Sequence, residues 1–340
     1  MSRNSKKTGI VVFIVILIIT AAIAGIGIYE STDNGSNATG NPSLEPSQKR
    51  SLFKNTDLLK KLKKQYIAAL YIEGTIEDAN KTYNQEWLLT TITALTDDEN
   101  NKAILLYINS PGGGVYQSDE VYLALCDYKK AGKTVFAYMG PIAASGGYYI
   151  ACAADKIYAN RNTLTGSIGV IAGESIDATE LLKKIGIKSE TITAGKNKNM
   201  FNYNSPLTEE QRKIMQSVAD EAYEQFTGIV AASRHMKITD VKKLADGRIY
   251  TAAQAQKNGL IDHIGSWNDA LSNLSNRISL GKAKVIPYRY QRNESFFDIL
   301  SGAVTHFTGS MTLSSLGLPQ ALANEIQPDV PYPAYIYKNK

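Results

Sequence analysis

The sequence contains few cysteines and few histidines. Its 340 residues include only two cysteines, Cys126 and Cys152, whose spacing fits no metal site. Both are therefore interpreted as small core residues. The three histidines, His235, His263 and His306, form no cluster. Accordingly, neither a metal ion nor any other cofactor is expected.

A strong excess of charge of one sign is also missing. The chain has 37 basic and 32 acidic residues, which give a net charge of +5. These charges are scattered and form no basic stripe with interleaved aromatics, so nucleic-acid binding is not expected. The apolar content of 44% fits a globular core, and no internal repeat crosses it.

One long apolar run stands near the N-terminus. Residues 9–28 are twenty without a charge, and residues 1–8 carry three basic side chains and no acid. At about 1.5 Å per residue, this run could cross a membrane core of about 30 Å. A cleaved signal peptide is the alternative, because residues 22–24 offer small side chains at cleavage spacing. The run continues past that point, which favours an uncleaved anchor.

The basic residues before the apolar run predict the membrane topology of the chain. The positive-inside rule places the N-terminus in the cytoplasm and the rest of the chain outside, as a single-pass protein of the cell membrane. Residues 29–52, rich in Ser, Asn, Gly, Thr and Pro, are expected to be a flexible linker. The globular domain is expected over 53–280, followed by a C-terminal extension and tail over 281–340.

Short apolar runs alternate with helical patterns from residue 67 onward. This alternation predicts an α/β domain with a mostly parallel sheet, whose functional loops follow the carboxyl ends of strands. The expected strands are 67–72, 103–108, 134–139, 156–159, 166–171, 190–193 and 285–290. The expected helices are 86–95, 119–130, 179–185, 208–233 and 267–278.

Residues 141–157 contain a serine in an unusual setting. Ser145 follows a strand-like run and precedes two glycines that open a buried helical pattern. An ordinary helix N-cap is one interpretation of Ser145. The crowd of alanines and glycines, which a cap does not need, favours a site that a substrate approaches closely.

A glycine loop at 111–114 follows an earlier strand. It could be a tight strand-to-helix turn. Three glycines after a proline favour a second role, in which uncovered backbone N–H groups bind a developing oxyanion. The N–H of Gly146, directly after Ser145, is the natural second donor.

A serine nucleophile also needs a proton acceptor. No histidine occurs between Ser145 and His235, and His235 lies in a stretch that indicates a surface or cap position. A desolvated lysine can accept the proton instead. Lys196 and Lys198 lie in an unusual loop, although solvated charges there are the simpler interpretation.

Four sequence blocks in one order resemble the bacterial signal peptide peptidase A family. That resemblance extends over roughly residues 67–275 and implies a serine protease of the Clp-protease/crotonase fold, built of repeated ββα units around a mostly parallel sheet, here preceded by one N-terminal transmembrane helix. The blocks are 109–113 (Asn-Ser-Pro-Gly-Gly), 144–149 (Ala-Ser-Gly-Gly-Tyr-Tyr), 165–170 (Thr-Gly-Ser-Ile-Gly-Val) and 195–198 (Gly-Lys-Asn-Lys).

The resemblance implies a role for particular residues. Ser145 matches the nucleophile, and the Gly-x-x-Lys block selects Lys198 rather than Lys196 as the general base. Ser167 matches a serine that orients this lysine, and Gly113 matches the oxyanion-hole glycine. One departure is the sequence Asn-Met-Phe at 199–201, where relatives more often carry an acid or a small residue.

The resemblance also implies an assembly and a substrate. This chain has room for one copy of the domain, which implies a homo-oligomer, a ring or dome of eight. In it, Lys198 of one subunit serves Ser145 of its neighbour. The implied substrates are remnant signal peptides and other small peptides.

Three rival functions are weighed against this interpretation. A Ser/Lys membrane protease of the same fold that acts on membrane-protein or stress substrates would carry further membrane spans, and residues 280–340 contain no run long enough for one. A crotonase-like acyl-CoA binding protein conflicts with the expected location outside the membrane. A catalytically silent scaffold conflicts with the intact blocks.

The tail carries one further hypothesis. Residues 329–340 are extended in character and apolar, with prolines and tyrosines. We expect this segment to be able to enter a substrate groove of its own or of a neighbouring subunit.

Overall fold

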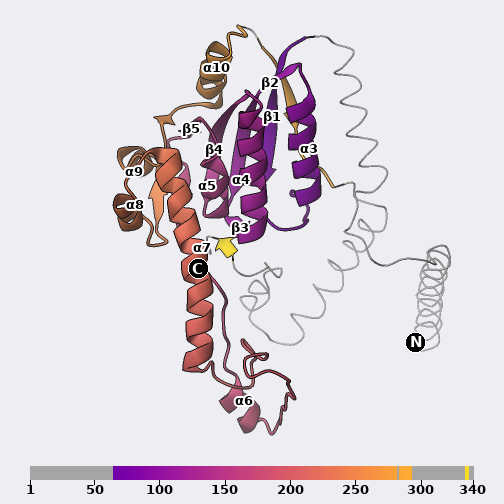
Figure 1. Ribbon diagram of the computed structural model, residues 1–340, viewed down its shortest axis with the longest axis vertical. Coiled ribbons are helices and arrows are strands. Elements are labelled where there is room, and N and C mark those ends of the chain that lie inside the picture. Colours follow the sequence, from indigo (N-terminus) through magenta and orange to yellow (C-terminus); the bar gives the residue numbers. More distant parts are fainter. Residues whose placement is uncertain (1–63, 282, 293–333, 337–340) are drawn as a thin grey trace, which may run out of the picture. The chain divides into compact units, whose positions relative to one another are not determined.

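The computed structural model describes residues 64–281, 283–292 and 334–336 (Figure 1). The expected anchor at 9–28 and the linker at 29–52 lie outside the described residues, as does most of the C-terminal tail. Within the described part of the chain, no helix has the length and apolar character needed to cross a membrane.

The described residues form an eight-stranded sheet. Six strands follow the order β7-β6-β4-β2-β1-β9, while β5 pairs with β4 and β8. All pairings in this sheet are parallel except the antiparallel β6–β7 pair, so the predicted α/β fold with a mostly parallel sheet is confirmed. The strands are β1 (Tyr66–Glu73), β2 (Asn101–Ser110), β4 (Thr134–Ala144), β5 (Lys156–Ala159), β6 (Leu164–Gly166), β7 (Ile249–Thr251), β8 (His263–Ile264) and β9 (Lys284–Tyr288).

A second, two-stranded sheet joins segments far apart in sequence. It consists of β3 (Gly112–Gly114), directly after β2, and β10 (Ala334–Ile336) from the tail. Figure 1 shows β10 in yellow beside β3, at the lower ends of α4 and α5.

Helices pack on both faces of the large sheet, and Figure 1 shows α3 and α4 over one of them. One face packs against α3 (Gln85–Asp97), α4 (Val115–Lys130) and α5 (Gly146–Ala151), and the other against α10 (Trp267–Arg277). Alternating strand residues explain the two layers, since Ile104 and Leu106 of β2 face the first group and Leu105 faces α10. The remaining described helices are α6 (Thr179–Lys184), α7 (Glu209–Arg234), α8 (Ile238–Leu244) and α9 (Ala252–Lys257).

Two of the predicted strands differ from the structure. The strand expected at 190–193 is wrong, because this segment is fully exposed and pairs with no described strand. An unpaired strand leaves its backbone groups without partners. The strand expected at 166–171 ends at Gly166, where a φ of +87° turns the chain.

A long arm follows this turn. From Gly169 to Glu221 no residue is buried, although the arm carries many apolar side chains. Ile192 is 93% exposed and Ile176 is 68% exposed. The arm includes α6, which has no buried residue, and the first half of α7. An apolar surface of this extent is typical of a protein–protein contact.

Helix α7 joins this arm to the main body. It begins as predicted at Thr208, whose side chain and that of Gln211 form a reciprocal capping box. Its last turn carries Arg234, whose side chain is 9% exposed and pairs with Asp262 at 2.9 Å.

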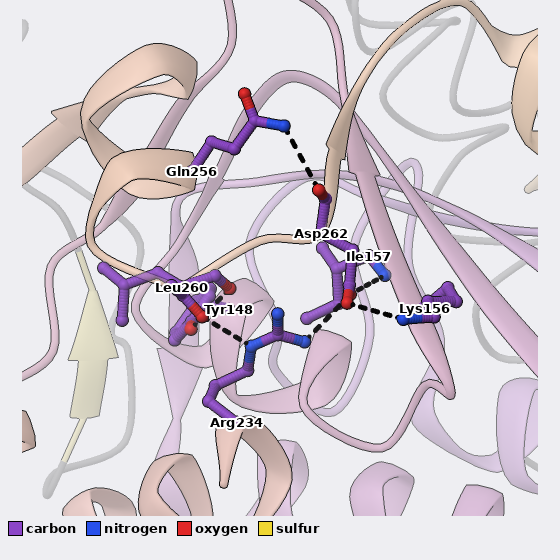
Figure 2. Close-up of polar contacts among 8 residues, drawn as sticks. Tyr148, Lys156, Ile157, Arg234, Gln256, Leu260 and Asp262 are labelled. Atoms are coloured by element: carbon purple, nitrogen blue, oxygen red, sulfur yellow. Dashed lines mark hydrogen bonds and ion pairs between the residues drawn. The ribbon is translucent and has the colours of Figure 1, made fainter. Parts of the chain in front are cut away.

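Arg234 and Asp262 form the centre of a partly buried network, which Figure 2 shows. Arg234 Nε donates to the Gly259 carbonyl, while Asp262 also accepts from the backbone N–H of Ile157 and from Lys156. Burial alone would raise the pKa of Asp262, but these bonds outweigh it and hold the pKa below its usual value. The network fixes the end of α7 to β5 and to the segment at 259–262.

Candidate active site

Ser145 occupies a sharp turn between β4 and α5. Its φ of +54° and ψ of −118° are rare for a residue with a side chain. Two backbone bonds hold this conformation, one from Ser145 N to the Gly166 carbonyl at 2.8 Å and one from Tyr149 N to the Ser145 carbonyl at 2.9 Å. Strained positions of this kind persist where the surroundings fix them, and they are concentrated at functional sites.

The hydroxyl of Ser145 does not cap the helix. Its side chain makes no capping hydrogen bond to α5, so the simple N-cap interpretation is wrong. Ser145 is 1% exposed, and its Oγ has no hydrogen-bond partner among the described residues. A buried polar group without a partner is costly, which points to a partner from outside the described part of the chain.

Two of the predicted oxyanion donors lie together beside Ser145. The backbone N of Gly113 lies 3.3 Å from the point where a Cβ of Gly146 would stand. On one edge of β3, the Gly112 carbonyl accepts a hydrogen bond from Ile76 N, and Gly114 N donates to the Ile76 carbonyl. Because neighbouring backbone groups of a strand point to opposite edges, the Gly113 N–H points the other way.

The glycines at these positions are required by space. A Cβ on Gly113 would stand 1.9 Å from the carbonyl oxygen of Ile76. A Cβ on Gly146 would stand 2.4 Å from Oγ of Ser118. A larger residue at Gly113 would displace the backbone of Ile76, and one at Gly146 would displace the Ser118 side chain and press on the backbone N of Gly113 at 3.3 Å.

Ser167 lies near the Ser145 turn because it directly follows Gly166, which bonds Ser145. Gly166 supplies the carbonyl that binds Ser145 N, and Ser167 follows it with a φ of +50°. The Ser167 N–H donates to the Arg248 carbonyl at 2.8 Å. Ser167 is buried and begins the chain segment that leads into the arm.

The two candidate lysines differ in their contacts. Lys196 forms an ion pair with Glu210 in the first turn of α7, and Asn197 donates to the same carboxylate. This hydrogen bond from Lys196 lowers the pKa of Glu210. Lys198 is exposed, and within the described residues its ammonium forms no hydrogen bond or ion pair. The chain therefore does not join Lys198 to its own Ser145 by a hydrogen bond.

The tail strand β10 lies along β3. The pairing is antiparallel and sets Tyr335 opposite Gly113, between Ala334 opposite Gly114 and Ile336 opposite Gly112. This backbone pairing agrees with the hypothesis that the tail can enter a substrate groove. β3 therefore accepts an extended segment along the edge opposite Ile76, the edge toward which the Gly113 N–H points.

A cavity of about 610 Å³ opens within the arm, between its segments 170–177 and 201–207 and the first half of α7. Its wall combines apolar residues with polar and charged ones: Val170, Ile171, Phe201, Leu207 and Met215, together with Asp177, Arg212 and Gln216. Phe201, in the block that departs from the family pattern, has a φ of +62° and packs on Gly173. The arm thus offers a partly apolar cavity a few residues beyond Ser167.

Sequence reasoning missed a group of polar residues behind the turn. Tyr149 of α5 donates from its hydroxyl to Asp119 of α4 and accepts from Gln225 of α7. The three residues lie far apart in sequence, and no motif links them. The only signal was the pair of tyrosines after the two glycines.

A strained buried serine beside two glycine N–H groups is the arrangement of a serine hydrolase. Comparison with known proteins gives the family. Residues 127–280 match the family model described as peptidase family S49. The chain belongs to this family, which is one of serine proteases.

Several relatives support this assignment. A proposed signal peptide peptidase SppA of Enterococcus faecium is 35% identical over 80% of this chain and 80% of its own length. A proposed protease of Synechocystis is 37% identical over 60% of this chain and 71% of its own. The chloroplastic serine protease SPPA of Arabidopsis thaliana is 33% identical over 68% of this chain but only 34% of its own.

Among solved structures, a point mutant of ClpP1 from Listeria monocytogenes resembles this chain. The match covers 64% of this chain and 99% of that one, with a TM-score of 0.41 and 20% sequence identity. At this TM-score the likeness adds no argument to the topology described above.

Proposed function

We propose that this protein is a membrane-anchored serine endopeptidase that uses a Ser145–Lys198 dyad to degrade remnant signal peptides. The observation that carries the proposal is the buried Ser145 hydroxyl, which lacks a partner within the described chain and lies beside the N–H groups of Gly113 and Gly146. Membership of peptidase family S49 supports the reaction class.

In the proposed mechanism, a neutral Lys198 amine takes the proton of Ser145 as its oxygen attacks the peptide carbonyl. The new C–O bond places negative charge on the carbonyl oxygen, which the N–H groups of Gly113 and Gly146 stabilise. Lys198 then gives the proton to the leaving amine, and the C–N bond breaks. Water resolves the acyl-enzyme by the reverse sequence of proton transfers.

The different contacts of the two lysines support Lys198 as the base. Lys196 is held in an ion pair by Glu210, so its ammonium is directed to the first turn of α7. Lys198, two residues on, is not committed to any described acid. In the proposed mechanism, Ser167 hydrogen-bonds Lys198 and orients its amine.

The base comes from a neighbouring subunit in this proposal. Ser145 has no partner within the described chain, while Lys198 lies on an arm without buried residues. Docking of this arm on a second copy would cover its apolar side chains and bring a lysine to the neighbour's serine. A closed ring of eight subunits repeats this contact at every interface.

Signal peptides fit the site as extended, apolar chains. The edge of β3 already takes β10 as an antiparallel strand, so a substrate strand can bind there through its backbone. The apolar part of the arm's cavity, with Val170, Phe201 and Leu207, would suit the small or apolar side chains of such peptides. The name of the Enterococcus faecium relative supports the same substrate class.

Location outside the cytoplasmic membrane completes the proposal. The apolar run at 9–28 supports an anchor, and the three basic residues before it support a cytoplasmic N-terminus. Released signal peptides remain in that same membrane, which brings enzyme and substrate together.

Mass spectrometry of cleaved peptides tests the substrate class. The full-length protein in detergent is expected to cut synthetic remnant signal peptides within their apolar segment while leaving a folded control protein intact. Ser145→Ala serves as the inactive control. Equal cleavage of unfolded polypeptides without any apolar segment would favour the alternative of a protease for membrane-protein or stress substrates.

Removal of the tail tests whether β10 competes with substrate. A chain ending at residue 326 lacks β10 and is expected to show a KM about three- to tenfold lower, because substrate no longer displaces an intramolecular strand from β3. The kcat should change little. Peptide hydrolysis measured for both chains gives the two constants, and unchanged kinetics would show that the tail does not regulate access.

A further inference from the structure

The strained turn at Ser145 needs support from behind. Helix α5 has only six residues, Gly146–Ala151, and all of them are buried. Its first turn closes through the bond from Tyr149 N to the Ser145 carbonyl. The position of Tyr149 therefore sets the position of the nucleophile directly, through one turn of backbone.

The side chain of Tyr149 is held from two other helices. Its hydroxyl donates to Oδ1 of Asp119 on α4 at 2.6 Å and accepts from Nε2 of Gln225 on α7 at 2.7 Å. Its ring packs at 5.0 Å from Phe226 and edge-on to Tyr122 at 5.5 Å. The Tyr149 hydroxyl therefore links α5 to both α4 and α7 by hydrogen bonds.

The same helix α7 holds the lysine loop at its other end. Glu210, in the first turn, binds both Lys196 and Asn197, the residues directly before Lys198. Gln225 lies further along this helix and reaches the nucleophile helix. One rigid element thus connects the loop of the proposed base to the support of the serine.

The neighbouring Tyr148 provides a contrast. Its hydroxyl donates to the Leu260 carbonyl at 2.8 Å, and burial raises its pKa, which keeps it protonated. The segment at 259–262 is held independently by Arg234 and Asp262, as Figure 2 shows. Loss of the Tyr148 hydroxyl would therefore leave α5 held by Tyr149.

We propose that Tyr149 is a positioning residue for Ser145, held in place by Asp119 and Gln225, and that Gln225 ties the nucleophile to α7. This inference rests on the proposed function, in which Ser145 is the nucleophile. Removing the hydroxyl lets α5 shift by a fraction of an ångström, and catalytic rates are sensitive to displacements on this scale.

The test compares four single variants of the full-length protein by peptide hydrolysis. Tyr149→Phe is expected to lower kcat about tenfold with KM within about twofold, because substrate binding on β3 is untouched. Gln225→Met should lower kcat about fivefold, and Gln225 is exposed, so this variant should fold normally. Tyr148→Phe and Glu224→Gln are the matched controls, the latter directly before Gln225 on the same helix and in an exposed ion pair with Lys242, and both should keep kcat within about twofold.

Further measurements distinguish a positioning role of Tyr149 from a loss of stability of the folded protein. The folded fraction and Tm of each variant, from circular dichroism, correct kcat for inactive protein. The shape of the pH–rate profile should be unchanged, because the base itself is not altered. The double variant Tyr149→Phe/Gln225→Met should be no slower than Tyr149→Phe alone, since both remove one link.

Three results would overturn the inference. They are an unchanged kcat in Tyr149→Phe, an unchanged kcat in Gln225→Met, or an equal loss in Tyr148→Phe. Ser145→Ala distinguishes these from failure of the proposed function. If Ser145→Ala is inactive, only the role of Tyr149 is lost; if it remains active, the nucleophile itself is wrong.

Discussion

Ser145→Ala is expected to lower peptide cleavage by at least about a thousandfold while the chain remains folded and assembled. The substitution removes the only atom that can form the acyl-enzyme in the proposed mechanism. It also removes a buried hydroxyl that has no partner in the described chain, so stability should be retained or slightly increased. Hydrolysis of a fluorogenic peptide, together with Tm and the oligomeric state, measures both effects.

A second buried serine is the matched control for this variant. Ser275 lies on α10, away from the turn at Ser145, and is 6% exposed. Ser275→Ala should keep full activity. Cleavage by Ser145→Ala at more than about a tenth of the normal rate would mean that another group is the nucleophile.

Lys198→Ala is expected to abolish cleavage to a similar extent, because without a base the serine keeps its proton. Lys196→Ala is the matched control in the same loop. It removes an exposed ion pair with Glu210, a contact that contributes little to stability, and should retain most of the activity. A loss in Lys196→Ala with normal turnover in Lys198→Ala would reverse the assignment.

Mixing the two inactive variants tests whether the dyad is shared between subunits. Co-expressed Ser145→Ala and Lys198→Ala chains should regain up to about a quarter of normal activity, because about one interface in four then joins an intact serine to an intact lysine. Each variant alone stays inactive. Mixed assemblies without any activity would show that both groups act within one chain.

The layout of the sheet could be predicted from the sequence because its signals are local. Buried parallel strands are continuous apolar runs, and β1, β2, β4 and β5 all form where such runs were found. The strand expected at 190–193 failed because strand formation depends on a neighbour, which the exposed arm does not provide. The pairing of β10 with β3 joins residues more than 200 positions apart, and only its possibility was foreseen.

The candidate site could be predicted only in part. The small residues around Ser145 and the glycine loop showed where backbone must approach closely, and the structure brings Gly113 and Gly146 together. The φ of +54° at Ser145 could not be inferred, because it results from bonds to the distant Gly166 and to Tyr149. The contact of Gln225 with Tyr149 could not be inferred either, because Gln225 is an exposed glutamine without any distinctive sequence context.

The unpartnered hydroxyl of Ser145 has a consequence for the activity of a newly synthesised subunit. In the proposed assembly, a solitary subunit has a nucleophile without a base, so it is an inert precursor that needs no propeptide. At low concentration in the membrane the subunit stays monomeric and inactive, and at high concentration it assembles and becomes active. The rate of proteolysis would then rise more steeply than the amount of enzyme, giving a threshold below which neighbouring exported proteins are spared.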